Sequence, residues 1–298
     1  MFLSTVFLKI FILFGVIYVK KRFAVIGFPL GHTMSPFIHN HMFSLTGVDA
    51  EYEAILISPD ELKQKINLLK TYDGFNITIP HKQAIIPFLD SLSKSAEIYG
   101  AVNTVANKNG LLTGYSTDAD GFSSALALEG VSLKGKVLIC GAGGVSRTIA
   151  TECVLAGCEV TIAARHSSLK KAQDLAAELS ERFKKPVLYT SLADISKSYD
   201  IAVNGTPVGM YPNTADSVLT DEQISRIGFI FDSVYNPQNT ALVTRAKALG
   251  VKATSGMGML VMQAAKAQEH WYGATFKKQD IKNLITLAND EMRRIFNG

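Results

Sequence analysis

The sequence predicts an α/β fold with two domains and a cleft between them. Apolar runs typical of strands alternate with helical patterns along most of the chain, which is the signature of consecutive βαβ units. The alternation starts afresh after a Gly- and Lys-rich patch at residues 130–136. With 298 residues, the chain is long enough for two domains of ordinary size, each with its own core.

The first domain is expected at residues 23–120. Strand-like runs and helical patterns alternate in it, in the order FAVIGF, residues 36–46, AEYEAILI, residues 59–69 and GFNITI. Ser35 before Pro36 predicts the start of the first helix, because serine caps free amides and proline is tolerated in the first turn. The segment AVNTVANKNGLLTGYSTD follows, and a helix is expected from about Asp120 to Leu128.

The second domain is expected at residues 121–255 and repeats the same pattern. Its predicted elements are, in order, KVLIC, the helix after GAGG, CEVTIAAR, residues 168–183, PVLYT, DIAVNGT and FIFDSVY. The last segment, residues 256–298, is helical twice over and has no strand of its own. We expect these two C-terminal helices to fold back across the cleft or onto the first domain.

Residues 1–22 form an apolar N-terminal extension, MFLSTVFLKIFILFGVIYVKKR. The run resembles a membrane segment, but Lys9 interrupts it, it is barely long enough to span a bilayer, and no basic region precedes it. We interpret it as an extension upstream of the true start, or as an amphiphilic tail. A membrane-tethered form is the alternative.

The composition is typical of a compact cytoplasmic protein. The formal net charge of +4 comes without long Lys/Arg runs, so no nucleic-acid partner is indicated. Cys140, Cys153 and Cys158 are odd in number and form no CxxC pair, which predicts reduced core residues. His39 and His41 lie two apart on a predicted helix and face different directions, so no metal site is predicted.

A glycine-rich turn, GAGGVSR, follows the strand KVLIC and opens a helix. Such a turn places backbone amides and a helix N-terminus against a pyrophosphate. Gly141 makes the turn and Gly143 allows close approach. The pattern predicts a Rossmann-type dinucleotide-binding domain. Its predicted cofactor-binding residues are Gly141, Ala142, Gly143, Gly144, Val145 and Ser146.

The end of the next strand indicates which dinucleotide is bound. CEVTIAAR ends in Arg165, where an NAD-binding unit would place an acid on the adenosine ribose. An acid there would repel a 2′-phosphate, whereas an arginine fork can pair with it. Lys171 continues this cationic edge. NADP is therefore the predicted cofactor.

The stretch FNITIPHK, residues 75–82, carries a polar face on a strand-like run. Asn76 and Thr78 are two apart and so point to one side of the strand. Pro80 ends the ladder because it has no N–H to donate, and Lys82 then projects from the turn. Such strand ends are where α/β proteins build sites. The alternative is a surface-loop lysine.

Four polar clusters stand in otherwise apolar surroundings: GHTMSP, NITIPHK, AVNT and YSTDADG. They supply hydroxyls, amides, one amine and one carboxylate, a set that suits a small polyhydroxylated acid. Together with GAGGVSR, NGTPVGMYP, YNPQNT and GMGMLVMQAA, they resemble the shikimate dehydrogenase (shikimate/quinate dehydrogenase) family. The resemblance runs from Phe23 almost to the end of the chain.

The resemblance implies reversible, NADPH-dependent reduction of 3-dehydroshikimate to shikimate, a step of chorismate and aromatic amino acid biosynthesis. It places the family's catalytic lysine at Lys82 and its partner aspartate at Asp118. Reducing a ketone requires a proton as hydride arrives, so we interpret Lys82 as the acid in the reductive direction. Asp118 favours the ammonium form and is assigned to hydrogen bonding and orientation.

The resemblance also implies which residues bind the ligands. The substrate carboxylate falls to the hydroxyls of Thr33 and Ser35, where Thr33 departs from the commoner serine. Other substrate-binding positions are Thr78, Asn103, Tyr235 and Gln263. Further cofactor-binding positions are Asn204, Thr206, Met210 and Gly256. Each of these residues, taken alone, could instead be structural.

Two other functions stay open at this point. A broader quinate/shikimate dehydrogenase is one, although Ser35 and Arg165 both differ from the residues that such paralogues tend to carry. A non-catalytic NADP-binding regulator is the other, although it would tolerate loss of Lys82 or Asp118. The predicted partner is a small-molecule substrate, with no nucleic acid and no membrane. A homodimer is left open.

Overall fold

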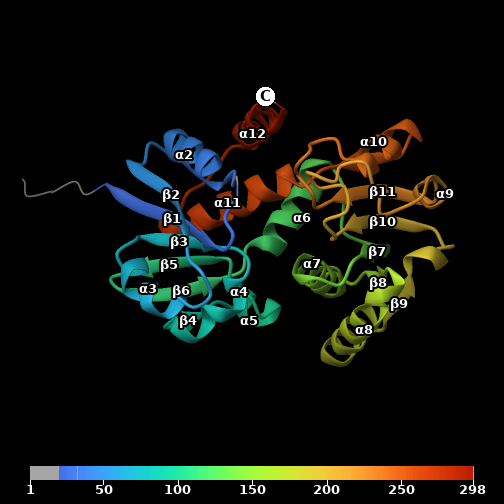
Figure 1. Cartoon of the computed structure of the whole chain (residues 1–298), viewed down its shortest axis with the longest axis horizontal. Helices are drawn as coiled ribbons and strands as arrows, with labels where there is room; N and C mark the ends of the chain where they lie inside the picture. The colour runs from blue at the N-terminus through green and yellow to red at the C-terminus, as the bar shows by residue number, and fades with distance from the viewer. Residues whose placement is uncertain (1–19, 32, 298) are drawn as a thin grey trace, which may run out of the picture.

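The computed structural model describes residues 20–31 and 33–297, which form two α/β units, each built on a six-stranded sheet (Figure 1). Most of the predicted apolar extension, residues 1–19, lies outside the described residues. Within the described part of the chain, no helix is long and apolar enough to cross a membrane.

The first sheet is mixed. Its strands lie in the order β2 (Ala50–Leu56), β1 (Lys21–Gly27), β3 (Gly74–Ile77), β5 (Thr104–Lys108), β6 (Leu111–Tyr115) and β4 (Ser91–Leu92). β5 is antiparallel to both β3 and β6, whereas β1 is parallel to β2 and β3. β1 begins two residues before the predicted start at Phe23, because Lys21 and Arg22 already pair with β2 in register.

Short helices surround this sheet. They are α2 (Ser35–Thr46), α3 (Leu62–Leu69), α4 (His81–Ala84), η1 (Ile86–Phe88) and α5 (Lys94–Tyr99). The predicted cap at Ser35 is wrong: Met34 occupies the cap position, and Ser35 is the first helical residue. Thr33 explains the shift, because its Oγ1 accepts the Ser35 backbone N–H at 3.3 Å. The Ser35 hydroxyl is therefore not used to cap the helix.

The second sheet is entirely parallel. Its strands lie in the order β9 (Val187–Ser191), β8 (Glu159–Ala164), β7 (Lys136–Cys140), β10 (Tyr199–Asn204), β11 (Ile227–Asp232) and β12 (Lys252–Thr254). This is the doubly wound dinucleotide-binding order, with the direction of winding reversing between β7 and β10. Ligands bind such sheets outside the carboxyl ends of the strands at that reversal. The predicted α/β fold with a Rossmann-type second unit is confirmed.

Helices cover both faces of the parallel sheet, which explains why its strands are apolar on both sides. They are α6 (Asp118–Leu128), α7 (Gly144–Leu155), η2 (His166–Ser168), α8 (Leu169–Phe183), η3 (Leu192–Asp194), α9 (Asp221–Ile224) and α10 (Ala241–Ala248). On one face, Ile149 of α7 and Leu175 of α8 pack against Ile162. On the other, Leu242 of α10 packs with Ile230.

The last two helices, α11 (Met257–Tyr272) and α12 (Lys278–Asn297), return to the first sheet (Figure 1). Trp271 of α11 is buried, and its indole Nε1 donates to the Val105 carbonyl of β5 at 2.9 Å. Leu284 and Met292 of α12 pack in a cluster with Met42 of α2. The helices therefore attach the end of the chain to the first sheet and to α2.

Helices α6 and α11 approach closely at Gly121. A Cβ at this position would lie 2.8 Å from the Met259 carbonyl oxygen of α11, which is backbone and cannot swing away. We expect Gly121→Ala to lower the free energy of unfolding by about 1–3 kcal/mol through overpacking. Urea denaturation measures it, with Gly144→Ala as the control because nothing lies within 4 Å of a Cβ there. Equal stability of both variants would contradict the close packing.

Candidate active site

A cavity of about 360 Å³ lies between the two units. Residues of β3, α4 and α6 line it from one side, and the glycine-rich turn and the segment after β11 line it from the other. All eight predicted catalytic and substrate-binding residues line this one cavity: Thr33, Ser35, Thr78, Lys82, Asn103, Asp118, Tyr235 and Gln263. The structure thus brings together side chains that are up to 230 positions apart in the sequence (263 − 33).

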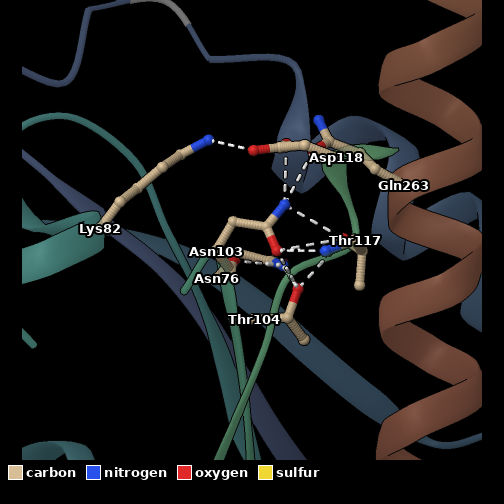
Figure 2. Close-up of polar contacts among 7 residues, drawn as sticks. All are labelled: Asn76, Lys82, Asn103, Thr104, Thr117, Asp118 and Gln263. Carbon is tan, nitrogen blue, oxygen red and sulfur yellow. Dashed lines mark hydrogen bonds and ion pairs between the residues drawn. The ribbon is translucent and has the colours of Figure 1, made fainter. Parts of the chain in front are cut away.

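Lys82 and Asp118 form an ion pair in this cavity (Figure 2). Lys82 Nζ donates to Asp118 Oδ2 at 2.6 Å, and their side chains are only 28% and 14% exposed. Asp118 is the first residue of α6, where the helix dipole favours its negative charge. The partly buried position limits solvent screening, so the carboxylate holds the ammonium at one place in the cavity.

Asn103 holds the other oxygen of Asp118. Its Nδ2 donates to Asp118 Oδ1 at 2.8 Å and to Gln263 Oε1 at 3.2 Å, while its Oδ1 accepts the Thr117 backbone N–H at 2.8 Å (Figure 2). Asn103 is 4% exposed. Because both ends of the amide are bonded, Asn103 has a single orientation, and Asp118 is oriented through it.

Polar side chains that were not predicted as site residues form a chain of hydrogen bonds that ends at Asn103. Asn76 Nδ2 donates to Thr104 Oγ1 at 3.0 Å, and Asn76 Oδ1 accepts from the Tyr52 hydroxyl at 2.7 Å. Thr104 Oγ1 in turn donates to Asn103 Oδ1 at 3.2 Å. The polar face of the strand at Asn76 was the only signal in the sequence for this layer.

The backbone around Lys82 is fixed by its neighbours. His81 is fully buried, and its Nε2 lies 2.7 Å from the Ile57 carbonyl oxygen, so that nitrogen carries the proton. The Lys82 carbonyl accepts the Val102 N–H at 2.8 Å. The turn after β3 is thereby attached to two other segments, and the lysine side chain extends from a rigid base.

Two hydroxyls lie together at the start of α2. Thr33 Oγ1 donates to Ser35 Oγ at 3.2 Å, and both residues line the cavity. Paired hydroxyls of this kind can donate to a carboxylate. Their position at a helix N-terminus adds the favourable end of the helix dipole.

His39, also missed as a site residue, lines the cavity from α2. It is 2% exposed, and burial lowers its pKa to about 3, so the ring is neutral at physiological pH. Gln268 Nε2 donates to its Nδ1 at 3.0 Å, which leaves the proton on Nε2. Tyr235 lies at the cavity after β11, and burial raises its pKa.

The glycine-rich turn fits a dinucleotide pyrophosphate. Gly141 has φ +109°, a left-handed conformation that favours glycine, and a Cβ there would meet Thr206 at 2.8 Å. At Gly143 and Gly144, by contrast, nothing lies within 4 Å of a Cβ, so the amides at the start of α7 are open to a ligand. Val145 of the same turn lines the substrate cavity.

The other predicted cofactor-binding residues differ in their exposure to solvent. Arg165 is exposed at the end of β8, Lys171 is exposed on α8, and Met210 is 46% exposed. Ser146 is fully buried, and its hydroxyl donates to the Gly205 carbonyl at 3.2 Å, which locks the turn to the loop after β10. Gly256 lines the substrate cavity.

Asn204 is only 1% exposed, so its side chain points into the protein rather than to a ligand. Its Oδ1 accepts from the Thr206 hydroxyl at 2.6 Å, and its Nδ2 donates to Asp232 Oδ1 at 2.9 Å. Asp232, which the sequence did not single out, also accepts from the Thr240 hydroxyl at 2.6 Å. This buried network shapes the loop that carries Thr206.

Burial raises the pKa of Asp232 from 3.8 to about 6, despite the hydrogen bonds that it accepts. Because the folded pKa lies above the unfolded one, the stabilising proton is fully bound below about pH 4 and is lost as pH rises through about 6. Relative to Asp232→Asn, the wild type should lose about 2 kcal/mol of unfolding free energy between pH 4 and 7. Urea denaturation of both proteins across this range measures it, and parallel pH profiles would contradict it.

Among the described residues, no cluster of three or more His, Cys, Asp or Glu side chains is placed to hold a metal ion.

The fold and the site together define a class of enzyme. The second sheet is a parallel sheet of the dinucleotide-binding type, its glycine-rich turn is open, and a lysine–aspartate pair lies in the cleft. These features are those of a nicotinamide-dinucleotide-dependent dehydrogenase with a separate substrate unit.

Comparison with known proteins identifies the family. Residues 25–105 match the shikimate dehydrogenase substrate binding domain, and residues 125–239 match the shikimate / quinate 5-dehydrogenase model. The shikimate dehydrogenase (NADP(+)) of Caldanaerobacter subterraneus subsp. tengcongensis is 37% identical over 270 residues, which cover 89% of this chain and 96% of that protein. This chain belongs to the shikimate dehydrogenase family, which confirms the resemblance seen in the sequence.

Solved structures agree with this assignment. A shikimate dehydrogenase in complex with NADP+ is 35% identical with a TM-score of 0.84, covering 92% of this chain and 96% of its own. The shikimate 5-dehydrogenase of Thermus thermophilus in complex with NADP(H) and shikimate is 33% identical with a TM-score of 0.80, covering 90% of this chain and 99% of its own.

Proposed function

We propose that Lys82 and Asp118 carry out the proton chemistry of an NADP-dependent shikimate dehydrogenase: the reversible reduction of 3-dehydroshikimate to shikimate, a step of the shikimate pathway. The observation that carries this proposal is the Lys82–Asp118 pair, with Nζ 2.6 Å from Oδ2, in a cavity that Val145 of the nucleotide turn also lines. Substrate and dinucleotide sites are therefore adjacent.

Lys82 is the acid in the reductive direction and the base in the oxidative one. When bound, NADPH supplies the hydride to the substrate carbonyl carbon, and the alkoxide oxygen then needs a proton, which Lys82 Nζ delivers. Asp118 holds the Lys82 ammonium group in place and accepts a hydrogen bond from a substrate hydroxyl. Asn103 keeps Asp118 oriented, as its 2.8 Å bond to Oδ1 supports.

Recognition of the rest of the substrate falls to the side chains around this pair. Thr33 and Ser35 donate to the substrate carboxylate, supported by their position at the N-terminus of α2. Thr78, Gln263 and Tyr235 contact the ring hydroxyls and the reacting carbon from three different segments. We assign residues 23–120 to substrate binding, 121–255 to NADP binding and 256–298 to the returning helices.

Arg165 is proposed to bind the 2′-phosphate of NADP at the end of β8, with Lys171 on the following helix adding charge. Gly141 to Ser146 bind the pyrophosphate through backbone amides. Thr206, Met210 and Gly256 line the nicotinamide side, and Asn204 acts there through Thr206. A cytoplasmic location is proposed because Cys140, Cys153 and Cys158 are free and buried.

The direct test is dinucleotide reduction followed by absorbance, with shikimate and then quinate as the alcohol, and with NADP and then NAD as the acceptor. We expect turnover with shikimate and NADP, and much weaker turnover with the other combinations. Comparable activity with quinate would favour the broader quinate/shikimate dehydrogenase. No activity with any pair would overturn the proposed function.

A further inference from the structure

His39 lines the substrate cavity, yet the proposed reaction gives it no role. It lies in α2, four residues after Ser35, so the two side chains share one side of the helix. Both residues line the cavity, although His39 is only 2% exposed. Burying two ring nitrogens costs free energy that an apolar ring of similar size would not cost, which indicates a polar role for this histidine.

The neighbours of the His39 ring set its tautomer. Gln268 is fully buried, and its Nε2 donates both to the His39 carbonyl oxygen at 3.2 Å and to His39 Nδ1 at 3.0 Å. A carbonyl only accepts, so it fixes which end of the Gln268 amide faces His39. Gln268 Oε1 is occupied as well, since it accepts from the Tyr272 hydroxyl. Nδ1 is therefore the acceptor of the ring, and the proton is on Nε2.

Nε2 is the ring nitrogen without a hydrogen-bond partner. Burial lowers the pKa of His39 to about 3, and the Asn76 side chain beside the ring opposes this shift. However, Asn76 Oδ1 accepts from the Tyr52 hydroxyl at 2.7 Å, and no described residue accepts from His39 Nε2 with hydrogen-bond geometry. Nε2 is not sealed inside the protein either, because the buried side-chain atoms that lack a partner in the described part of the chain are His81 Nδ1 and Asn289 Oδ1. The N–H therefore opens onto the cavity that His39 lines.

Aromatic rings hold the imidazole in this orientation. It stacks on the Tyr52 ring, with centroids 4.2 Å apart and planes 5° apart, and the Trp271 ring lies 5.1 Å away. Both aromatic residues are buried. A flipped imidazole would lose the bond from Gln268 to Nδ1, so Nε2 stays directed at the cavity.

The free N–H lies near the hydroxyls that are proposed to bind the substrate carboxylate. Burial raises the pKa of Tyr52, and a hydrogen bond with the Ser35 side chain opposes the rise. The Ser35 hydroxyl therefore lies beside the ring on which His39 stacks. Thr33 Oγ1 in turn lies 3.2 Å from Ser35 Oγ. His39, Ser35 and Thr33 consequently occupy one end of the cavity.

The cavity offers no unpaired cation for a carboxylate at this end. Among the described residues that line it, Lys82 is the only lysine or arginine, and it pairs with Asp118. A carboxylate bound beside Thr33 and Ser35 is therefore held by neutral donors. Hydrogen bonds to a charged acceptor are stronger than those between neutral groups, so one further neutral donor adds substantially to the affinity.

We propose that His39 is a substrate-binding residue, whose neutral imidazole donates from Nε2 to the substrate carboxylate beside the hydroxyls of Thr33 and Ser35. The assignment rests on the proposed function, because it takes the ligand to be shikimate or 3-dehydroshikimate. A neutral donor suits this place: a buried imidazolium would be left as an unpaired charge whenever the cavity is empty, whereas a neutral ring is not.

The first test compares the dissociation constant of shikimate among variants of the full chain, measured by calorimetry without dinucleotide. His39→Leu removes the donor and should weaken shikimate binding about tenfold or more, since the lost bond is to a charged group. In steady-state kinetics this variant should raise the KM for shikimate rather than lower kcat. His39→Gln, whose amide N–H reaches the place of Nε2, should bind shikimate within about threefold of the wild type.

His41→Leu is the matched control. His41 belongs to the same helix, but its Nδ1 donates to the Phe37 carbonyl at 2.8 Å, and it does not line the cavity. Shikimate affinity should be unchanged in this variant. Equal losses of affinity in His39→Gln and His39→Leu would indicate a merely structural role for His39 and would overturn the assignment.

The second test is nuclear magnetic resonance of the ¹⁵N-labelled wild type, which does not depend on the stability of His39→Leu. The ring nitrogens of His39, identified by their absence from the spectrum of His39→Gln, should show the Nε2–H tautomer at neutral pH, and the Nε2 resonance should shift when shikimate is added. A resonance that stays in place at saturating shikimate, or unchanged affinity in His39→Leu, would overturn the assignment and leave the proposed function standing. Failure of the wild type to bind shikimate would overturn both.

Discussion

Replacing Lys82 with alanine should lower kcat by about 10²- to 10⁴-fold while leaving the affinity for NADPH unchanged. The reason is that Nζ, 2.6 Å from Asp118 Oδ2, is the proposed proton donor to the substrate oxygen, and the nucleotide turn lies on the other side of the cleft. Steady-state kinetics with shikimate and NADP, together with fluorescence titration of NADPH, separate turnover from cofactor binding.

Lys94→Ala is the matched control for this variant, because Lys94 is an exposed lysine of α5 that does not line the cavity. It should retain wild-type kinetics. Addition of a small primary amine to Lys82→Ala should restore part of the lost turnover if proton transfer is the missing step. Near-normal turnover of Lys82→Ala without any added amine would remove the assigned role.

Replacing Arg165 with alanine should raise the KM for NADP about 10- to 100-fold and leave the KM for NAD unchanged. A hydrogen-bonded charge pair contributes about 1.5–3 kcal/mol, which corresponds to that range, and the 2′-phosphate is present on NADP alone. Arg165 is suited to this contact because it is exposed at the end of β8, beside the first turn of the dinucleotide-binding sheet.

Lys170→Ala serves as the control for Arg165. Lys170 is an exposed cation of α8 close in sequence, and its Nζ pairs with Asp174 Oδ1 at 2.7 Å. It should leave both KM values unchanged, which would exclude a general effect of surface charge. An equal increase in KM for NADP and for NAD in Arg165→Ala would place the arginine elsewhere than at the 2′-phosphate.

Local patterns in the sequence were sufficient for the second unit. Buried parallel strands read as continuous apolar runs, and the glycine-rich turn marks the first of them, so KVLIC and GAGGVSR predicted the dinucleotide fold directly. The first unit was harder. Its βαβ pattern did not reveal that β5 and β6 are antiparallel, because alternation of strands and helices does not record strand direction.

The sequence alone determined the class of fold, the dinucleotide turn, Arg165 in place of an acid, and the polar clusters that carry Lys82 and Asp118. Only the tertiary structure decided which side chains are in contact. Asn103 bonds Gln263, 160 residues away, and Asn204 bonds Asp232 on the neighbouring strand. Such contacts depend on how distant segments pack, and packing is a collective property that spacing along the chain does not encode.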